Sequence, residues 1–259
     1  KPPAHGGVVH GLRTPVSAFG LAHDKRRARH AFHPAGEDQV CLSDLAGIRA
    51  SAAGHTRDTL PSGVPALREA LAADAGSRRS VEFSPDQVVI APGNKPLLLL
   101  PMLAILEPGD EVVYPDPGFP IYRSMIDYTG ATAIPVPIRE ENRFAFSAEE
   151  TLSKITPATR LLIINSPANP TGGVTPKSEI DKLVAGLEAH PQVAILSDEI
   201  YDVMTYDGET HTSLLAYPEI RDRLIILNGW SKTWAMTGWR MGWSIWPNGP
   251  ESADLYDKV

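Results

Sequence analysis

The sequence predicts an α/β fold in which a largely parallel β-sheet is covered by helices on both faces. From about residue 64 onward, short β-branched runs alternate with segments of helical composition. Strands that are joined through helices pair in parallel, and both faces of the resulting sheet become covered. Polar residues follow four of the expected strands, at the edge of the sheet where open α/β folds bind their ligands.

Six runs carry the strand pattern and stop at turn residues. They comprise residues 87–91, 111–114, 133–137, 160–165, 193–197 and 224–228. Three helices are expected around them. One begins at Pro65, where proline occupies a first-turn position, and one follows Gly93 and extends to residue 106. The third opens near Pro176, with Glu179 in its first turn.

Charge and cysteine content narrow the classes of function. A formal net charge of -7 argues against general affinity for nucleic acid or anionic lipid, both of which attract basic surfaces. The single cysteine, Cys41, cannot form an internal disulfide, so we expect a cytoplasmic location. The longest apolar run, residues 97–106, is about half the length of a membrane span. We therefore expect no membrane association. We also expect no bound metal.

The polar groups after the four strands are Gly93-Asn94-Lys95, Asn165 through Gly172, Asp198 through Tyr201, and Ser231-Lys232. Each has a plain structural explanation as a turn, a helix cap or a surface charge. Their order and spacing are more specific: Asp198 lies 29 residues after Asn169, and Lys232 lies 34 residues after Asp198. Each interval leaves room for one strand–helix–strand unit of about 30 residues.

Taken together, the motifs resemble those of the class I/II aminotransferases, which are fold-type-I enzymes dependent on pyridoxal 5'-phosphate (PLP). The stretches that carry the resemblance are Asn165-Ser-Pro-Ala-Asn-Pro-Thr-Gly172, Ser197-Asp-Glu-Ile-Tyr201 and Ser231-Lys-Thr-Trp-Ala-Met-Thr-Gly-Trp-Arg240. The resemblance covers roughly residues 54 to 247. It implies that residues 54–259 are a PLP-binding large domain, incomplete at its C-terminal end, and that residues 1–53 are an N-terminal arm.

The resemblance also assigns roles to single residues. Lys232 would form the internal aldimine with PLP and later move the substrate α-proton. Asp198 would keep the pyridine nitrogen protonated, while Asn169 and Tyr201 would bind the phenolic oxygen. The phosphate would be held by Gly93, Asn94, Lys95, Ser231 and Arg240. The aromatic side chain of Phe119 would stack on the pyridine ring. Tyr122 is interpreted as a packing residue, and the five tryptophans as pocket wall and core.

The sequence departs from the family in three respects, of which the first concerns cofactor binding and the other two concern substrate recognition. Asp58 stands where the family has a tyrosine that reaches the cofactor phosphate of the neighbouring subunit, and a carboxylate there would repel the phosphate. No Gly-rich substrate loop occurs between Gln39 and Ala53, and the C-terminal small domain with its carboxylate-binding arginine is absent. We therefore expect a fragment or damaged copy with impaired turnover.

The function predicted from these motifs is transfer of an amino group between an amino acid and a 2-oxo acid, by a homodimer. Two alternatives stay open. A PLP-dependent lyase or synthase uses the same scaffold, because pocket details decide the fate of the substrate carbanion. A non-catalytic PLP-binding module joined to a DNA-binding domain is the other, although no helix-turn-helix or basic domain is visible in the sequence.

Overall fold

The computed structural model describes residues 52–54, 60–79 and 81–247. The chain divides into two compact units, Lys1–Thr56 and Arg57–Val259, and the fold described below is that of the second unit. Cys41 and Asp58 lie outside the described residues.

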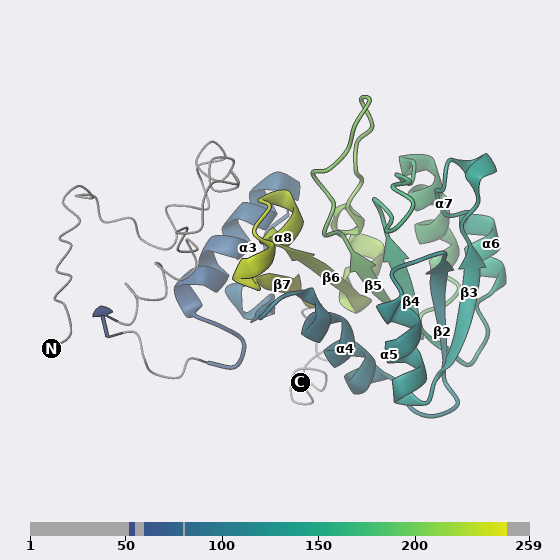
Figure 1. Ribbon diagram of the computed structural model, residues 1–259. Helices are drawn as coiled ribbons and strands as arrows, with labels where there is room; N and C mark the ends of the chain where they lie inside the picture. Colours follow the sequence, from purple (N-terminus) through teal and green to yellow (C-terminus); the bar gives the residue numbers. More distant parts are fainter. Residues whose placement is uncertain (1–51, 55–59, 80, 248–259) are drawn as a thin grey trace, which may run out of the picture. The chain divides into compact units, whose positions relative to one another are not determined.

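One seven-stranded sheet forms within the described part of the chain (Figure 1). Its strands follow the spatial order β1-β7-β6-β5-β4-β2-β3. Their bounds are β1 Val88–Ala91, β2 Glu111–Asp116, β3 Thr132–Pro137, β4 Thr159–Asn165, β5 Ala194–Asp198, β6 Leu224–Gly229 and β7 Gly242–Ile245. Strands β2 to β6 pair in parallel, whereas β7 runs antiparallel between β1 and β6.

The register of the central strands brings their carboxyl ends to one level. Asn165 at the end of β4 pairs with Asp198 at the end of β5, and Asp198 pairs with Leu227 of β6. The residues that follow these three strands therefore emerge next to one another at a single edge of the sheet. This is the edge at which open α/β sheets bind ligands.

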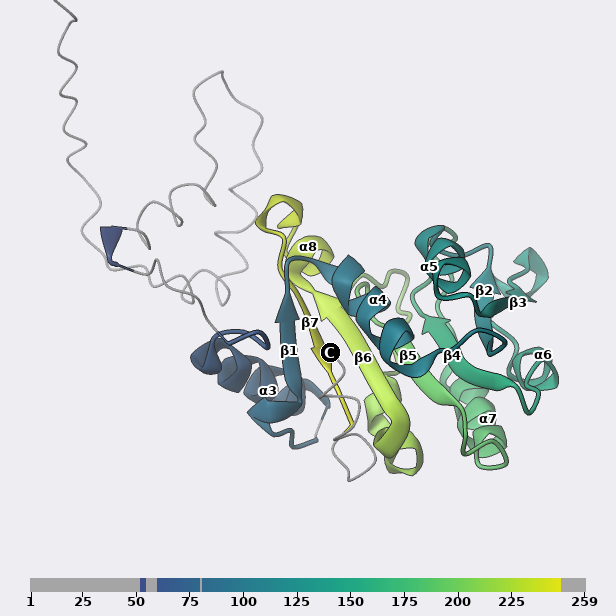
Figure 2. The same ribbon diagram turned by 90° about the horizontal axis from the view of Figure 1, so that it is seen from below.

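Helices cover both faces of the sheet (Figure 2). On one face, α4 (Asn94–Ile105) and α5 (Ile121–Thr129) pack on a core that includes Leu97, Ile126 and Ile163. On the other face, α3 (Pro65–Arg79), α6 (Ala148–Ser153) and α7 (Lys177–Leu187) pack on a core that includes Leu71 and Leu183. Short helical segments complete the fold: α8 (Trp230–Thr233), η1 (Pro85–Gln87), η2 (Glu140–Asn142), η3 (Leu214–Ala216), η4 (Pro218–Arg223) and η5 (Thr237–Trp239).

Helix α7 illustrates how sequence pattern determines packing. Its buried residues are Ile180, Leu183, Val184 and Leu187, a spacing that places all four on one side of a helix. At its start, the Glu179 carboxylate accepts a hydrogen bond from the Ala148 N–H at 2.8 Å and so joins α7 to α6. The apolar stripe faces the sheet, and the polar first turn fixes where the helix begins.

The fold confirms the six predicted strands and the three predicted helices, with boundaries that differ by a few residues. Strand β7 and helices α5 and α6 were not predicted. Trp243 and Trp246 belong to the core, as expected, whereas none of the five tryptophans lines the cleft described below. Among the described residues, no helix has the length and apolar character needed to cross a bilayer.

Candidate active site

A cleft of about 290 Å³ lies at the carboxyl edge of the sheet, where the ends of β4, β5 and β6 meet the start of α4. Its lining combines polar and apolar side chains, as small-molecule sites do. The lining residues are Asn94, Lys95, Leu98, Phe119, Tyr122, Asn165, Asn169, Asp198, Ile200, Tyr201, Ser231, Lys232, Thr237 and Arg240. Nine of the ten predicted cofactor-binding residues are among them, and the tenth, Gly93, directly precedes Asn94.

One end of the cleft is suited to an anion. Helix α4 starts after Gly93, so its first backbone N–H groups have no partner within the helix. Gly93 has a φ of 89°, and a Cβ atom there would lie 2.2 Å from Nη2 of Arg240. Only glycine therefore lets the guanidinium lie against this turn. Buried Ser231 and exposed Lys95 line the same cleft.

The Asn94 side chain provides an independent sign of a missing ligand. It lines the cleft, and the described residues offer no hydrogen-bond partner to its buried amide oxygen or nitrogen. Buried polar groups normally have partners, because leaving one unpaired costs about 1–3 kcal/mol. A bound anion would accept a hydrogen bond from its Nδ2, whereas its Oδ1 packs against Gly229 and Gly242.

The Asp198 carboxylate lies deep in the cleft and is 4% exposed. The Tyr122 hydroxyl donates to its Oδ2 at 2.8 Å, and the Ile200 N–H donates to its Oδ1 at 3.3 Å. Burial raises the pKa of Asp198 to about 6, although these two hydrogen bonds lower it. No salt bridge to Asp198 occurs within the described residues. A cationic ligand atom beside it would lower the pKa of Asp198 and stabilise its charged form.

Tyr122 was interpreted as a packing residue, and the structure adds a polar role. Its ring is fully buried and meets Phe119 edge to face, with 5.7 Å between ring centroids. Burial, followed by the nearby Asp198 charge, raises the pKa of the Tyr122 hydroxyl well above its ordinary value. The hydroxyl therefore stays protonated and acts as a donor. Nothing in the sequence around Tyr122 indicates the hydrogen bond of its hydroxyl to Asp198, because the two residues are 76 positions apart.

Asn165 also contributes more than its motif position suggested. Its Nδ2 donates to the Asp198 carbonyl oxygen at 2.9 Å, and its Oδ1 accepts from the Asn169 N–H at 2.8 Å. One buried amide thus fixes Asn169 relative to Asp198. The Asn169 side chain itself is partly buried and lines the cleft.

Lys232 occupies the open side of the cleft. It is exposed, in the short helix α8 that directly follows β6, and its Nζ lies 5.8 Å from the centroid of the Tyr201 ring. Burial, and then the Asp198 carboxylate, raise the pKa of Tyr201 above its ordinary value. The structure therefore brings the predicted amine, the predicted carboxylate and the predicted phenol into one cleft.

This set of residues fits PLP. The cofactor needs backbone donors and a cation for its phosphate, a carboxylate for its ring nitrogen, an aromatic surface and an amine for its aldehyde. The cleft supplies Arg240 and the start of α4, Asp198, Phe119 and Lys232 respectively. The unpaired Asn94 amide agrees with a ligand at the phosphate end.

Comparison with known proteins identifies close similarity over most of the chain. A relative from Petunia hybrida, a bifunctional aspartate aminotransferase and glutamate/aspartate-prephenate aminotransferase, is 37% identical over 202 residues, which are 78% of this chain and 42% of the relative. An arginine–pyruvate transaminase from Pseudomonas aeruginosa is 38% identical over 78% of this chain and 51% of its own length. The chain spans about half the length of the curated relatives that it matches.

Solved structures give the same result. The aspartate aminotransferase of Thermus thermophilus, solved with maleate, has a TM-score of 0.75 and 33% identity, covering 83% of this chain and 56% of its own. The alanine aminotransferase of Pyrococcus furiosus has a TM-score of 0.77 and 28% identity, covering 83% and 55% respectively. The family model for aminotransferase class I and II matches residues 38–251. The chain therefore belongs to the class I and II aminotransferases, a family of PLP-dependent enzymes.

Proposed function

We propose that this chain is the PLP-binding part of an aminotransferase that moves an amino group between an amino acid and a 2-oxo acid. Residues 54–259 would be the PLP-binding large domain and residues 1–53 an N-terminal arm. The observation that carries the proposal is the single cleft shared by Lys232, Asp198 and the anion-binding start of α4. The names of the relatives, all aminotransferases or transaminases, favour this function over a lyase or synthase.

Each residue of the site has a separate role in this proposed reaction. When bound, PLP supplies an electron sink for the electron pair released as the substrate's α-hydrogen leaves. Asp198 holds a proton on the ring nitrogen, and Tyr122 and Asn165 hold Asp198 in place. Lys232, on the open side of the cleft, carries a proton to and from the substrate α-carbon. Arg240, Ser231, Gly93, Asn94 and Lys95 bind the phosphate.

We also propose that the protein acts as a homodimer in the cytoplasm. The support for the dimer is the exposure of Lys232 and Arg240, which leaves one side of the cleft uncovered by the described residues, and the support for the location is the single cysteine. Light scattering with and without PLP tests the dimer. A monomer under both conditions would contradict it.

The test of function starts with covalent labelling. Adding PLP, reducing with borohydride and mapping the modified peptide should place the label on Lys232, and Lys232→Ala should remove it. Label on Lys95 or Lys177, in the wild-type chain, would show that the site is wrong. Lys177 is a suitable internal control because its amine is engaged by Asp181 at 2.6 Å, on the exposed surface of α7.

A second measurement separates transamination from elimination. With one amino acid and no 2-oxo acid, a transaminase stops after one equivalent per site, whereas a lyase continues to release product. Continued release of product would favour the lyase alternative.

A further inference from the structure

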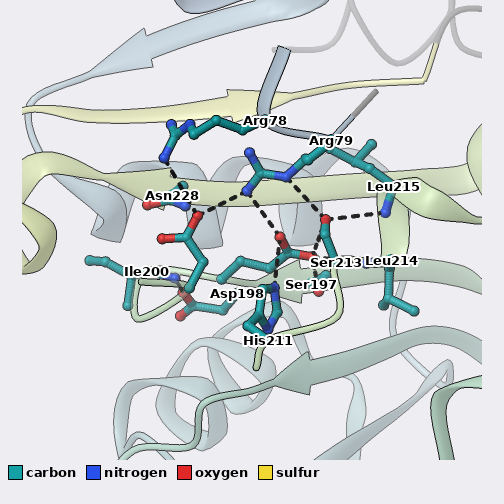
Figure 3. A network of polar contacts seen from close by, with 12 residues as sticks. Arg78, Arg79, Ser197, Asp198, Ile200, His211, Ser213, Leu214, Leu215 and Asn228 are labelled. Carbon is teal, nitrogen blue, oxygen red and sulfur yellow. Dashed lines mark hydrogen bonds and ion pairs between the residues drawn. The ribbon is translucent and has the colours of Figure 1, made fainter. Parts of the chain in front are cut away.

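A buried cluster of charged and polar groups lies beside Asp198 but outside the cleft. We call it the Arg79 cluster, and it consists of Arg79, Glu199, Asp202, His211 and Ser213 (Figure 3). None of these five residues is among those that line the cleft. The proposed chemistry gives the cluster no role.

Glu199 is the centre of the cluster and is 1% exposed. Its Oε1 accepts hydrogen bonds from the Ser213 hydroxyl at 3.0 Å and from the Leu214 N–H at 3.1 Å, and also from the Ser197 hydroxyl at 3.2 Å. Its Oε2 lies 3.2 Å from Nη2 of Arg79 and 3.2 Å from Nε2 of His211. Burial alone would raise the pKa of Glu199, but His211, Arg79 and Ser213 together lower it to about 2. The carboxylate is therefore ionised at neutral pH.

Arg79 is the residue that joins distant parts of the chain. It ends helix α3, yet its guanidinium reaches across to the turn after β5. Nη2 contacts Glu199 Oε2 at 3.2 Å and Asp202 Oδ2 at 3.1 Å, while Nε donates to Ser213 Oγ at 3.1 Å. The side chains of Arg79 and Asp202 are each only 7% exposed. Solvent therefore screens these ion pairs weakly.

The turn that Arg79 contacts is the one that carries the cofactor-facing side chains. Asp198 and Tyr201 line the cleft, and Glu199 and Asp202 lie on the Arg79 side. After Asp198 the backbone leaves the sheet, and three backbone hydrogen bonds hold the turn: Glu199 N–H donates to the Leu227 carbonyl, Asp202 N–H to Glu199 and Met204 N–H to Tyr201. Few backbone contacts thus hold this turn, and the two carboxylates give it side-chain anchors.

We propose that Arg79 is a positioning residue, which holds the turn of residues 198–202 so that Asp198 and Tyr201 face the cofactor. The inference rests on the proposed function, because it concerns geometry at the PLP site. It assigns to helix α3, at its C-terminal end, an influence on a cleft that it does not line.

Two arginines in succession provide a matched pair for the test. Arg78 lies next to Arg79 in the same helix, but it is 37% exposed, pairs mainly with Asp74 at 2.6 Å and approaches Asp202 only to 4.0 Å. The variants are Arg79→Met, Arg79→Lys and, as the control, Arg78→Met. Two quantities are measured at a temperature well below the thermal midpoint of each variant: PLP affinity, by titration of its visible absorbance, and amide hydrogen exchange of residues 199–204 without PLP.

Arg79→Met should weaken PLP binding at least tenfold and speed exchange in residues 199–204 at least tenfold. Arg79→Lys, which keeps the charge, should recover part of both, and Arg78→Met should stay within twofold of wild type. If Arg79→Met does not fold, Asp202→Asn serves instead, with an expected loss of at least threefold in affinity. Unchanged affinity with a lowered thermal midpoint would overturn the proposal and leave Arg79 a purely structural residue.

Failure of the PLP site itself gives a different result. The wild-type chain would then bind no PLP, and the exchange measurement alone would decide. Faster exchange confined to residues 199–204 in Arg79→Met, but not in Arg78→Met, would support the proposal that Arg79 holds the turn. Equal exchange in both variants would refute that proposal.

Discussion

The hydrogen bond from Tyr122 to Asp198 predicts a pH-dependent loss of stability in Tyr122→Phe. The wild-type pKa of Asp198 is raised from 3.8 to about 6, so Asp198 binds a proton more readily in the folded chain. Its contribution to the free energy of unfolding therefore falls as pH rises from about 4 to about 6, and stays low above that range. At about 1.4 kcal/mol per pKa unit, the wild-type chain loses roughly 3 kcal/mol through this group at pH 8.

Removing the Tyr122 hydroxyl lowers stability more where Asp198 is charged than where it is neutral. A hydrogen bond to a charged group contributes about 1.5–3 kcal/mol, and one between neutral groups about 1 kcal/mol. Tyr122→Phe should therefore lower the free energy of unfolding by about 2 kcal/mol at pH 8 and by about 1 kcal/mol at pH 5. Urea denaturation of the chain without PLP, at both pH values, measures the difference.

The control is Tyr128→Phe, because Tyr128 is 75% exposed and lies on the same helix, α5. It should change the free energy of unfolding by less than about 0.5 kcal/mol at either pH. Equal losses at pH 5 and pH 8 in Tyr122→Phe would refute the reasoning, since the loss would then not depend on the charge of Asp198.

Three further changes test other parts of the structure. Gly93→Ala should weaken PLP binding at least tenfold in an absorbance titration, because its Cβ would displace Arg240, and a change within twofold would contradict this. Leu183→Ala, in the fully buried stripe of α7, should cost about 2–5 kcal/mol in urea denaturation, with no change in m-value. Asn165→Leu should lower stability by about 1–3 kcal/mol, because it leaves the Asn169 N–H without its acceptor; full stability would show that this bond is replaced.

Much of the sheet could be predicted because local pattern and tertiary environment agree. The run at residues 161–164 is continuously apolar, and the structure buries it on both faces of a parallel sheet. Strand β7 could not be predicted in the same way. It has four residues, begins with Gly242 and contains Trp243 and Ser244, so no period is visible. Its strand geometry comes from pairing with β6, the preceding strand, and with β1, which lies about 150 residues earlier in the sequence.

Some residues of the candidate site could likewise be predicted from the sequence, and others could not. Residues such as Lys232 and Asp198 follow strands in a characteristic order, so spacing and residue type were enough to select them. Tyr122 and Arg79 contact the same carboxyl edge from helices, and their partners are 76 and 120 residues away. No local pattern encodes such a contact. The role of each site residue stays a prediction until labelling and mutation test it.

The antiparallel return of β7 has a mechanical consequence for the lysine segment. Gly229 at the end of β6 pairs with Gly242 at the start of β7, and the Trp230 N–H donates to the Met241 carbonyl at 3.2 Å. The loop between them is thus closed at its base, and it carries both Lys232 and Arg240. The backbone positions of the amine and the guanidinium are therefore tied to the same pair of strands, although eight residues separate them in the sequence.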